Sequence, residues 1–156
     1  MSQQLSLLSA HDPALHDRQA MLALLDSWQG EGWLRVLDVA LARFCVELDP
    51  HSPPLLLLGA ALSSLQLGHG HVCLDLAACL AEPSLGLSVN PSASTLPPAR
   101  LLQQISLDDW LSSLQQSPLA GTAEAGNSPL VLDGQRLYLR RYWNYEQTVA
   151  KQIAAR

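Results

Sequence analysis

The stretch PPLLLLGAALSSLQLG, residues 53–68, decides the fold, because it is apolar on almost every side of a helix. Two prolines open it, and proline suits the first helical turn, where its missing N–H has no partner anyway. Gly68 and Gly70 are typical of a helix end. A helix that is apolar all round must be enclosed by other elements. We therefore predict a buried central helix from about Leu55 to Leu67 in a mainly α domain.

Two amphipathic helices are predicted before this central helix. The first begins near Asp17 and has apolar residues at helical spacing up to Trp28. The second runs from Trp33 to Leu48. It stops at Asp49, because the residue before a proline is pushed out of the helical region. The apolar positions of the second helix in register are Leu34, Leu37, Leu41, Phe44, Cys45 and Leu48.

Short helices and loops follow the central helix. A short helix is predicted over residues 76–81, whereas residues 83–105 are rich in Pro, Ser and Ala and are interpreted as a surface loop. Ser106 is a candidate N-cap, with Asp109 three residues later as a weak capping box for the next helix. Residues 116–128 are predicted to form a second loop.

The stretch PLVLDGQRLYLRRYW, residues 129–143, predicts a β-hairpin. Asp133 and Gly134 form its expected two-residue turn, because both residue types tolerate positive φ. Such a turn pairs Leu130 with Leu137. The face predicted to join the core holds Leu130, Leu132, Leu137, Leu139 and Trp143. The other face holds Val131, Arg136, Tyr138, Arg140 and Tyr142. A short helix after Asn144 completes the expected small helical bundle with its C-terminal hairpin.

Arginine and tyrosine alternate on the second face of this hairpin, a mixture that is enriched at protein interfaces. We therefore hypothesise that Tyr138, Arg140, Arg141 and Tyr142 lie at or near a protein interface. The alternative is a DNA-binding face, because arginine and aromatic side chains also pair with phosphates and stack on bases.

The charge distribution limits the classes of partner. The chain has 156 residues and a formal net charge of −5. Residues 1–128 carry four Arg and twelve acids, whereas residues 129–156 carry five basic side chains and two acids. An acidic body repels phosphate, so a broad nucleic-acid footprint is not expected.

Length and composition predict one soluble, cytoplasmic domain over residues 16–156, after a flexible leader at residues 1–15. The first residues lack the basic start of a signal peptide. The longest apolar run, residues 55–62, falls short of the roughly 20 residues that span a bilayer. Three cysteines without framework spacing are typical of reduced thiols in a cytosolic protein.

A metal site is the first chemistry considered, at His69, His71 and Cys73. If these residues lay on a strand, their alternation would point all three side chains the same way, and imidazole and thiolate both bind zinc. However, the sequence offers no convincing fourth ligand. A Cys73–His71 nucleophile pair is the second possibility, but catalytic pairs are recognised by geometry and not by proximity in sequence.

Nucleotide chemistry is not expected of this chain. Its one lysine, Lys151, is not part of a GK[ST] phosphate loop, and no GxGxxG is present. We therefore predict no catalytic residue, no cofactor and no metal.

Two stretches resemble a known family. GHGHVCLDL at residues 68–76 and PLVLDGQRLYLRRYWNYEQTVA at residues 129–150 resemble the N-terminal region of RecD, the alpha subunit of exodeoxyribonuclease V. The segment from about Trp33 to Leu80 is similar as well. The second stretch is the more specific, because it combines a fixed turn, the alternating strand and a following helix.

The resemblance implies an ATP-dependent 5′→3′ DNA helicase subunit that works with RecB-like and RecC-like subunits on double-strand ends, in repair and recombination. In that family the motor, which uses ATP and Mg, follows this region, so the chain is expected to be one domain of a longer subunit. The resemblance also implies that this domain docks on the RecC-like subunit and connects to the motor. DNA would then be met mainly through the complex.

Overall fold

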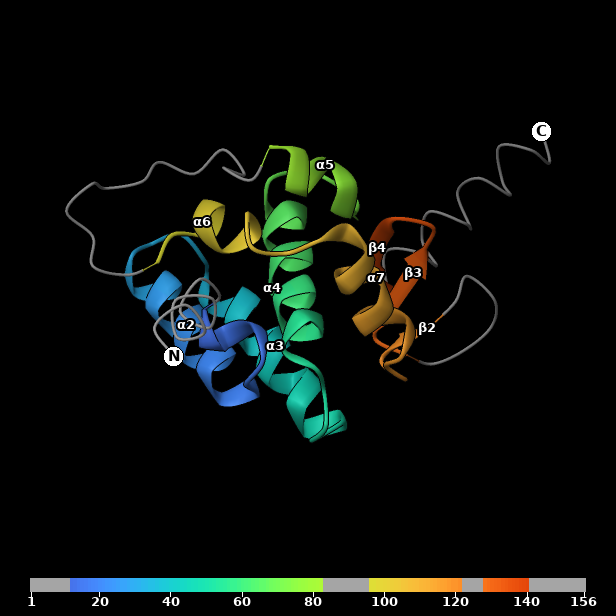
Figure 1. Ribbon diagram of the computed structural model, residues 1–156, viewed down its shortest axis with the longest axis horizontal. Coiled ribbons are helices and arrows are strands. Elements are labelled where there is room, and N and C mark those ends of the chain that lie inside the picture. Colours follow the sequence, from blue (N-terminus) through green and yellow to red (C-terminus); the bar gives the residue numbers. More distant parts are fainter. Residues whose placement is uncertain (1–11, 83–95, 122–127, 141–156) are drawn as a thin grey trace, which may run out of the picture.

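A computed structural model describes residues 12–82, 96–121 and 128–140 of the chain. It confirms a mainly α fold. Helix α4 (Pro54–Gly68) lies at the centre of the molecule, with helices on several sides of it (Figure 1). Every residue of α4 from Leu55 to Leu65 is buried, as the apolar pattern predicts.

The N-terminal elements pack together on α4. They are the short 3-10 helix η1 (Pro13–Leu15), α2 (Arg18–Gly30) and α3 (Val36–Leu48). Helix α2 begins after Asp17, as expected, and the Asp17 carboxylate caps it by accepting the backbone N–H of Ala20. Ala14 in η1 is fully buried, so the end of the segment that we expected to be a loose leader belongs to the core.

We predicted that the second helix begins at Trp33, but helix α3 begins at Val36. The backbone N–H groups of Trp33 and Leu34 both donate to the Trp28 carbonyl at the end of α2, which turns the chain before α3 starts. Gly32 permits this turn, because its φ of 81° lies in the left-handed region. Trp33 and Leu34 are buried, but they belong to the connection between α2 and α3 and not to α3 itself.

Two later helices are capped by side chains, and the cap at Ser106 confirms our prediction. Helix α5 (Leu76–Ala81) is capped by the Asp75 side chain, and α7 (Leu107–Gln115) is capped by Ser106, whose Oγ accepts the Asp109 N–H at 3.1 Å. Helix α7 is attached to the central helix by Trp110, whose Nε1 donates to the Leu55 carbonyl at 3.0 Å.

Helix α6 (Pro98–Leu102) corrects our interpretation of residues 83–105 as a loop. Leu101 and Leu102 are almost completely buried and belong to the main core. The helix is only five residues long, which is too short for a periodic apolar pattern to reveal it in the sequence.

The sheet is small and lies beside α4 and α7 (Figure 1). Its order is β1-β4-β3-β2, with strands β1 (Leu74–Asp75), β2 (Ala120–Gly121), β3 (Leu130–Asp133) and β4 (Arg136–Leu139). The pairs β1–β4 and β3–β4 are antiparallel, whereas β2 and β3 are parallel. The sequence predicted the β3–β4 hairpin but neither β1 nor β2. Strand β2 lies within residues 116–128, which we expected to be a loop.

The hairpin register differs from our prediction. Asp133 pairs with Arg136, so the turn residues are Gly134 and Gln135 and not Asp133 and Gly134. Leu130 therefore faces Leu139 and not Leu137. Gly134 has a φ of 62°, which suits the first position of a tight hairpin turn. The register error spans two residues, so the predicted sides of the strands are unchanged.

Among the described residues, no helix is long and apolar enough to cross a bilayer. The central helix α4 has 15 residues, which is short of the roughly 20 that a membrane span requires.

Candidate docking surface

The predicted interface face of the hairpin is largely covered. Val131 is fully buried and Tyr138 is 6% exposed, so both sides of the hairpin are covered near its middle. Tyr138 therefore offers a partner little accessible surface. The side chain of Tyr138 hydrogen-bonds to the neighbouring Arg136 and thereby raises the pKa of this guanidinium.

Arg140 is half-buried and engaged within the domain. Its Nη2 donates to Ser128 Oγ at 2.7 Å, and its Nε donates to the Ser128 carbonyl at 3.1 Å. Its backbone N–H donates to the Pro129 carbonyl at 2.8 Å, which extends the hairpin by one bond. The other two predicted interface residues, Arg141 and Tyr142, lie outside the described residues, as do Trp143 and the expected last helix.

The three candidate metal ligands lie in a turn and not along one strand. His69 is the C-cap of α4, and Gly70 turns the chain with a φ of 91°. Strand β1 begins only at Leu74, after Cys73, so the alternation of the three side chains does not point them to one side. His69 and His71 are exposed and Cys73 is half-buried. Within residues 12–82, 96–121 and 128–140, no three His, Cys, Asp or Glu side chains are grouped as metal ligands would be.

The other two cysteines are inside the core. Burial raises the pKa of Cys45 to about 11. Burial, assisted by the nearby Asp75 carboxylate, raises the pKa of Cys79 to about 12. Both thiols therefore remain protonated at neutral pH and lack the thiolate that nucleophilic catalysis needs.

An exposed apolar surface lies on α3, and we call it the α3 patch. Its four members are Val36 (69% exposed), Leu37 (62%), Phe44 (46%) and Leu48 (49%). Half-buried Leu41 lies between them along the helix. Isolated exposed apolar side chains are ordinary, but Leu37, Phe44 and Leu48 stand at i, i+7 and i+11 on one helix face, and such a group indicates an interaction site.

The patch is exposed because α3 packs on the core through its other face. The helix turns Val39 and the smaller residues Ala42 and Cys45 inward, and it contacts α4 and α2. Small side chains permit close approach of two helices, because the interaxial distance depends on the side chains at the contact. The large residues at 37, 44 and 48, which we had placed in register with Cys45, are consequently left on the outside.

A groove of about 310 Å³ continues from this patch toward the sheet. Its apolar lining comes from Leu37 and Leu41 of α3, Leu67 of α4 and Leu139 of β4. Arg35, Ser64 and Gly68 complete it. The patch and the groove share Leu37, so a partner segment on α3 would reach the groove as well.

A buried carboxylate holds one end of this groove in place. Asp38 is completely buried and accepts the backbone N–H of Arg35 at 2.8 Å and the Arg35 Nη2 at 2.7 Å. Ser64 Oγ donates to the same carboxylate at 2.6 Å, and Arg35 Nη2 also donates to the Ser64 carbonyl at 2.7 Å. This network joins the start of α3 to α4, and it raises the pKa of Arg35.

Gly68 leaves room for this arginine. A Cβ on Gly68 would lie 2.6 Å from the guanidinium carbon of Arg35. The guanidinium therefore rests directly on the last turn of α4, and any larger residue at position 68 would displace it.

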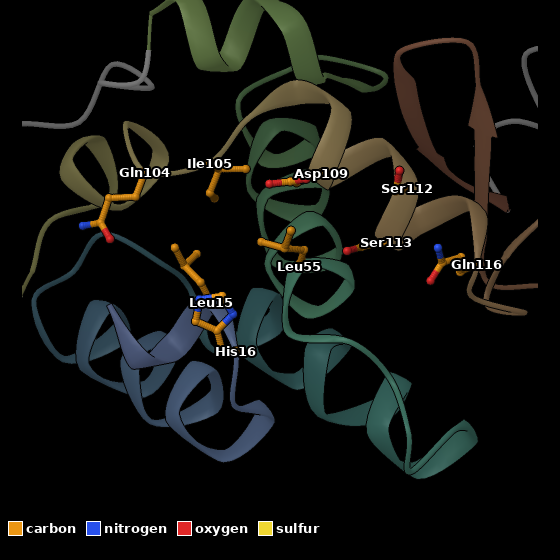
Figure 2. A pocket seen from close by; sticks show the side chains of 9 residues that line it. All are labelled: Leu15, His16, Leu55, Gln104, Ile105, Asp109, Ser112, Ser113 and Gln116. Atoms are coloured by element: carbon orange, nitrogen blue, oxygen red, sulfur yellow. The ribbon is translucent and has the colours of Figure 1, made fainter. Parts of the chain in front are cut away.

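A second hollow, on the other side of α4, is the η1–α7 cleft, with a volume of about 390 Å³. Figure 2 shows its lining side chains, which come from η1, α4, α7 and the segment after α6. They are Leu15, His16, Leu55, Gln104, Ile105, Asp109, Ser112, Ser113 and Gln116. The sequence did not reveal this cleft, because its lining residues come from four separate segments.

Comparison with known proteins identifies one family. The model of the family described as "RecBCD enzyme subunit RecD, N-terminal domain" matches residues 30–138. This range includes α3, α4, the patch, every groove residue except Leu139, and nearly all of the hairpin.

One curated relative is similar over a shorter range. It is named erythronate-4-phosphate dehydrogenase, from Pseudomonas savastanoi pv. phaseolicola, and is 35% identical over 98 residues. The match covers 63% of this chain and 22% of that protein, so the chain spans less than a quarter of the relative's length.

Proposed function

Because this chain belongs to the family of RecD N-terminal domains, we propose that it is a non-catalytic assembly domain of a RecD-like helicase subunit. In this proposal it docks the helicase motor onto a RecC-like subunit, within a complex that also contains a RecB-like subunit. ATP and Mg would be used by the motor and not by this domain. The complex would act in double-strand-break repair and recombination.

The single observation that carries the proposal is the α3 patch. Four large apolar side chains remain 46–69% exposed on one helix although the same domain buries an extensive core. Exposing apolar surface to water is unfavourable, and an amphipathic helix on an apolar surface is a common recognition mode. The adjacent groove provides a place for an apolar side chain of the partner.

The patch supports protein docking more than the alternative of a DNA-binding module. DNA binding depends on exposed cationic side chains that release counterions from phosphate. The α3 patch is apolar, and the guanidinium of Arg140 on the hairpin is engaged by Ser128.

The hairpin residues stay in the proposal as a secondary contact. Arg140, Arg141 and Tyr142 follow the groove residue Leu139 in the chain. A partner that covers the groove would therefore contact the chain at Leu139, directly before these residues in the sequence. Tyr138 is better assigned to packing within the domain, because it is already buried.

The test is co-purification of this domain with a RecC-like subunit. We expect the double substitution Leu37→Ser with Phe44→Ser to reduce recovery of the complex at least about tenfold, because two central apolar contacts of about 1 kcal/mol or more each are lost. The control is Val72→Ser, which removes an apolar side chain of similar exposure (52%) from the loop before β1.

Thermal unfolding of each variant shows whether it is folded. These side chains are exposed, so the stability should change by no more than about 1 kcal/mol. Complex recovery that is unaffected by the double substitution would contradict the assignment of the α3 patch. Equal loss with Val72→Ser would show a general effect of surface polarity and would contradict it as well.

A further inference from the structure

The η1–α7 cleft is separate from the proposed docking surface, since it shares no lining residue with the groove beside α3. Its volume, about 390 Å³, lies in the range of small-ligand sites. Three kinds of feature indicate what it would bind: fixed walls, an apolar floor and a row of hydrogen-bond acceptors.

The walls of the cleft are fixed by hydrogen bonds between distant parts of the chain. Trp110 Nε1 donates to the Leu55 carbonyl at 3.0 Å, which attaches α7 to α4. The backbone N–H of Asp12 donates to Gln104 Oε1 at 2.7 Å, which attaches the start of η1 to the segment after α6. Fully buried Ala14 anchors η1 further. A cleft with fixed walls loses little conformational entropy when it binds.

The floor of the cleft is apolar. Leu15 and Leu55 approach it from η1 and α4, and Ile105 enters from the segment before α7 (Figure 2). Such a floor suits the methylene stem of a long side chain, which buries its carbons and keeps a polar head near water.

The α7 wall carries oxygen acceptors in a row. Asp109, Ser112 and Ser113 of α7 and its C-cap residue Gln116 stand at i, i+3, i+4 and i+7, so they lie along one side of the helix. The row supplies a carboxylate, two hydroxyls and an amide oxygen. The lining residues include no Lys or Arg, and the first 128 residues carry twelve acids against four Arg. His16, on the opposite wall, is the one lining side chain that can carry a positive charge.

We propose that the η1–α7 cleft binds an arginine side chain presented by a partner protein. The stem of the arginine lies on the apolar floor, and its guanidinium donates to Asp109 and to neighbouring oxygens of α7. Arginine fits this row better than lysine, because its planar group spreads five N–H donors over several acceptors. The cleft is thus a second contact point, independent of the α3 patch.

The test is a binding titration of this domain, followed by NMR at low salt and pH 8, with N-acetyl-arginine methylamide as the probe. The lysine and norleucine analogues are the comparison ligands. We expect the arginine probe to bind at least about threefold more tightly than the lysine probe and more tightly still than the norleucine probe. We expect the shifted signals to come from the cleft residues.

A matched pair of variants separates a specific contact from general charge. Asp109→Asn removes the carboxylate in the cleft, and we expect it to weaken arginine binding about fivefold, as for an exposed ion pair of roughly 1 kcal/mol. Asp108→Asn removes the neighbouring acid in the same first turn of α7, but Asp108 does not line the cleft. We expect it to change binding less than twofold.

Each remaining outcome overturns the proposal. If the norleucine probe binds as tightly as the arginine probe, the cleft recognises only apolar surface. If Asp109→Asn and Asp108→Asn weaken binding equally, the acidic surface as a whole, and not the cleft, attracts the arginine. Chemical-shift changes confined to residues outside the cleft would place the arginine elsewhere. Because these measurements involve no RecC-like subunit, their failure would leave the docking role of the α3 patch unaffected.

Discussion

Replacing Asp38 by Asn should destabilise the domain far more than the same replacement at Asp26. Both carboxylates form an ion pair with an arginine: Asp38 with Arg35, and Asp26 with Arg43. They differ in burial, because the Asp38 side chain is completely buried, whereas Asp26 and Arg43 are each about half exposed. The comparison therefore contrasts a buried carboxylate that accepts several hydrogen bonds with an exposed carboxylate that forms a surface ion pair.

The magnitude follows from the donors around Asp38. One carboxylate oxygen accepts Arg35 Nη2 and Ser64 Oγ, and the other accepts the Arg35 backbone N–H. In either orientation an Asn amide places an NH₂ group against one of these donors. Loss of one member of a buried pair costs about 3–5 kcal/mol, and we expect about 3 kcal/mol because Arg35 is 46% exposed and can reach water.

The measurement is unfolding by heat and by urea, followed by circular dichroism. A loss of about 3 kcal/mol should lower Tm by roughly 6–12 °C in a domain of this size. Asp26→Asn should cost no more than about 1 kcal/mol, the usual value of an exposed pair. The free energies of unfolding of the two variants should differ by about 2 kcal/mol or more. If they lie within about 1 kcal/mol of each other, at equal urea m-values, the argument that the buried network joins α3 to α4 is refuted.

Three further predictions concern the core. Trp110→Phe should lower the free energy of unfolding by about 2 kcal/mol, because it removes the hydrogen bond to the Leu55 carbonyl and part of a buried ring. Urea unfolding measures this loss, and a change below about 0.5 kcal/mol would contradict the prediction. Iodoacetamide at pH 8 should alkylate Cys73 in the folded protein and spare the buried residues Cys45 and Cys79. If mass spectrometry finds all three cysteines modified without denaturant, the burial of Cys45 and Cys79 is disproved. Because burial raises the pKa of Cys45 to about 11 and that of Cys79 to about 12, from ordinary values of 9.0, the unfolded chain loses these protons first. Stability should therefore fall as the pH rises from about 9 to about 12, and a double Cys→Ala variant of these two residues should show a shallower fall.

Local signals in the sequence predicted several features of the fold correctly. Asp17, Asp75 and Ser106 stand at helix starts because their short side chains accept backbone N–H groups, which is a property of residues close in sequence. The N-cap function of Ser106 was predicted directly, and the helix after Asp17 begins where expected. The β3–β4 hairpin was also predicted, although its turn lies one residue further along the chain.

The candidate docking surface was only partly predictable. The resemblance implied a docking domain, but the sequence did not show that an apolar docking patch lies on α3. Helix α3 has apolar residues on two faces, one with large side chains such as Leu37 and Phe44 and one with small side chains such as Ala42 and Cys45. Periodicity shows that two faces exist, but it does not show which of them contacts α4.

The central helix illustrates what the sequence by itself determined. A segment that is apolar on every side has only one favourable location, so residues 53–68 predicted a buried centre without knowledge of any neighbour. The tertiary structure alone decided the outward face of α3, the burial of Tyr138 and the walls of the η1–α7 cleft. The physical reason is that these properties belong to pairs of elements: whether a side chain is covered depends on the size and position of residues far away in the chain.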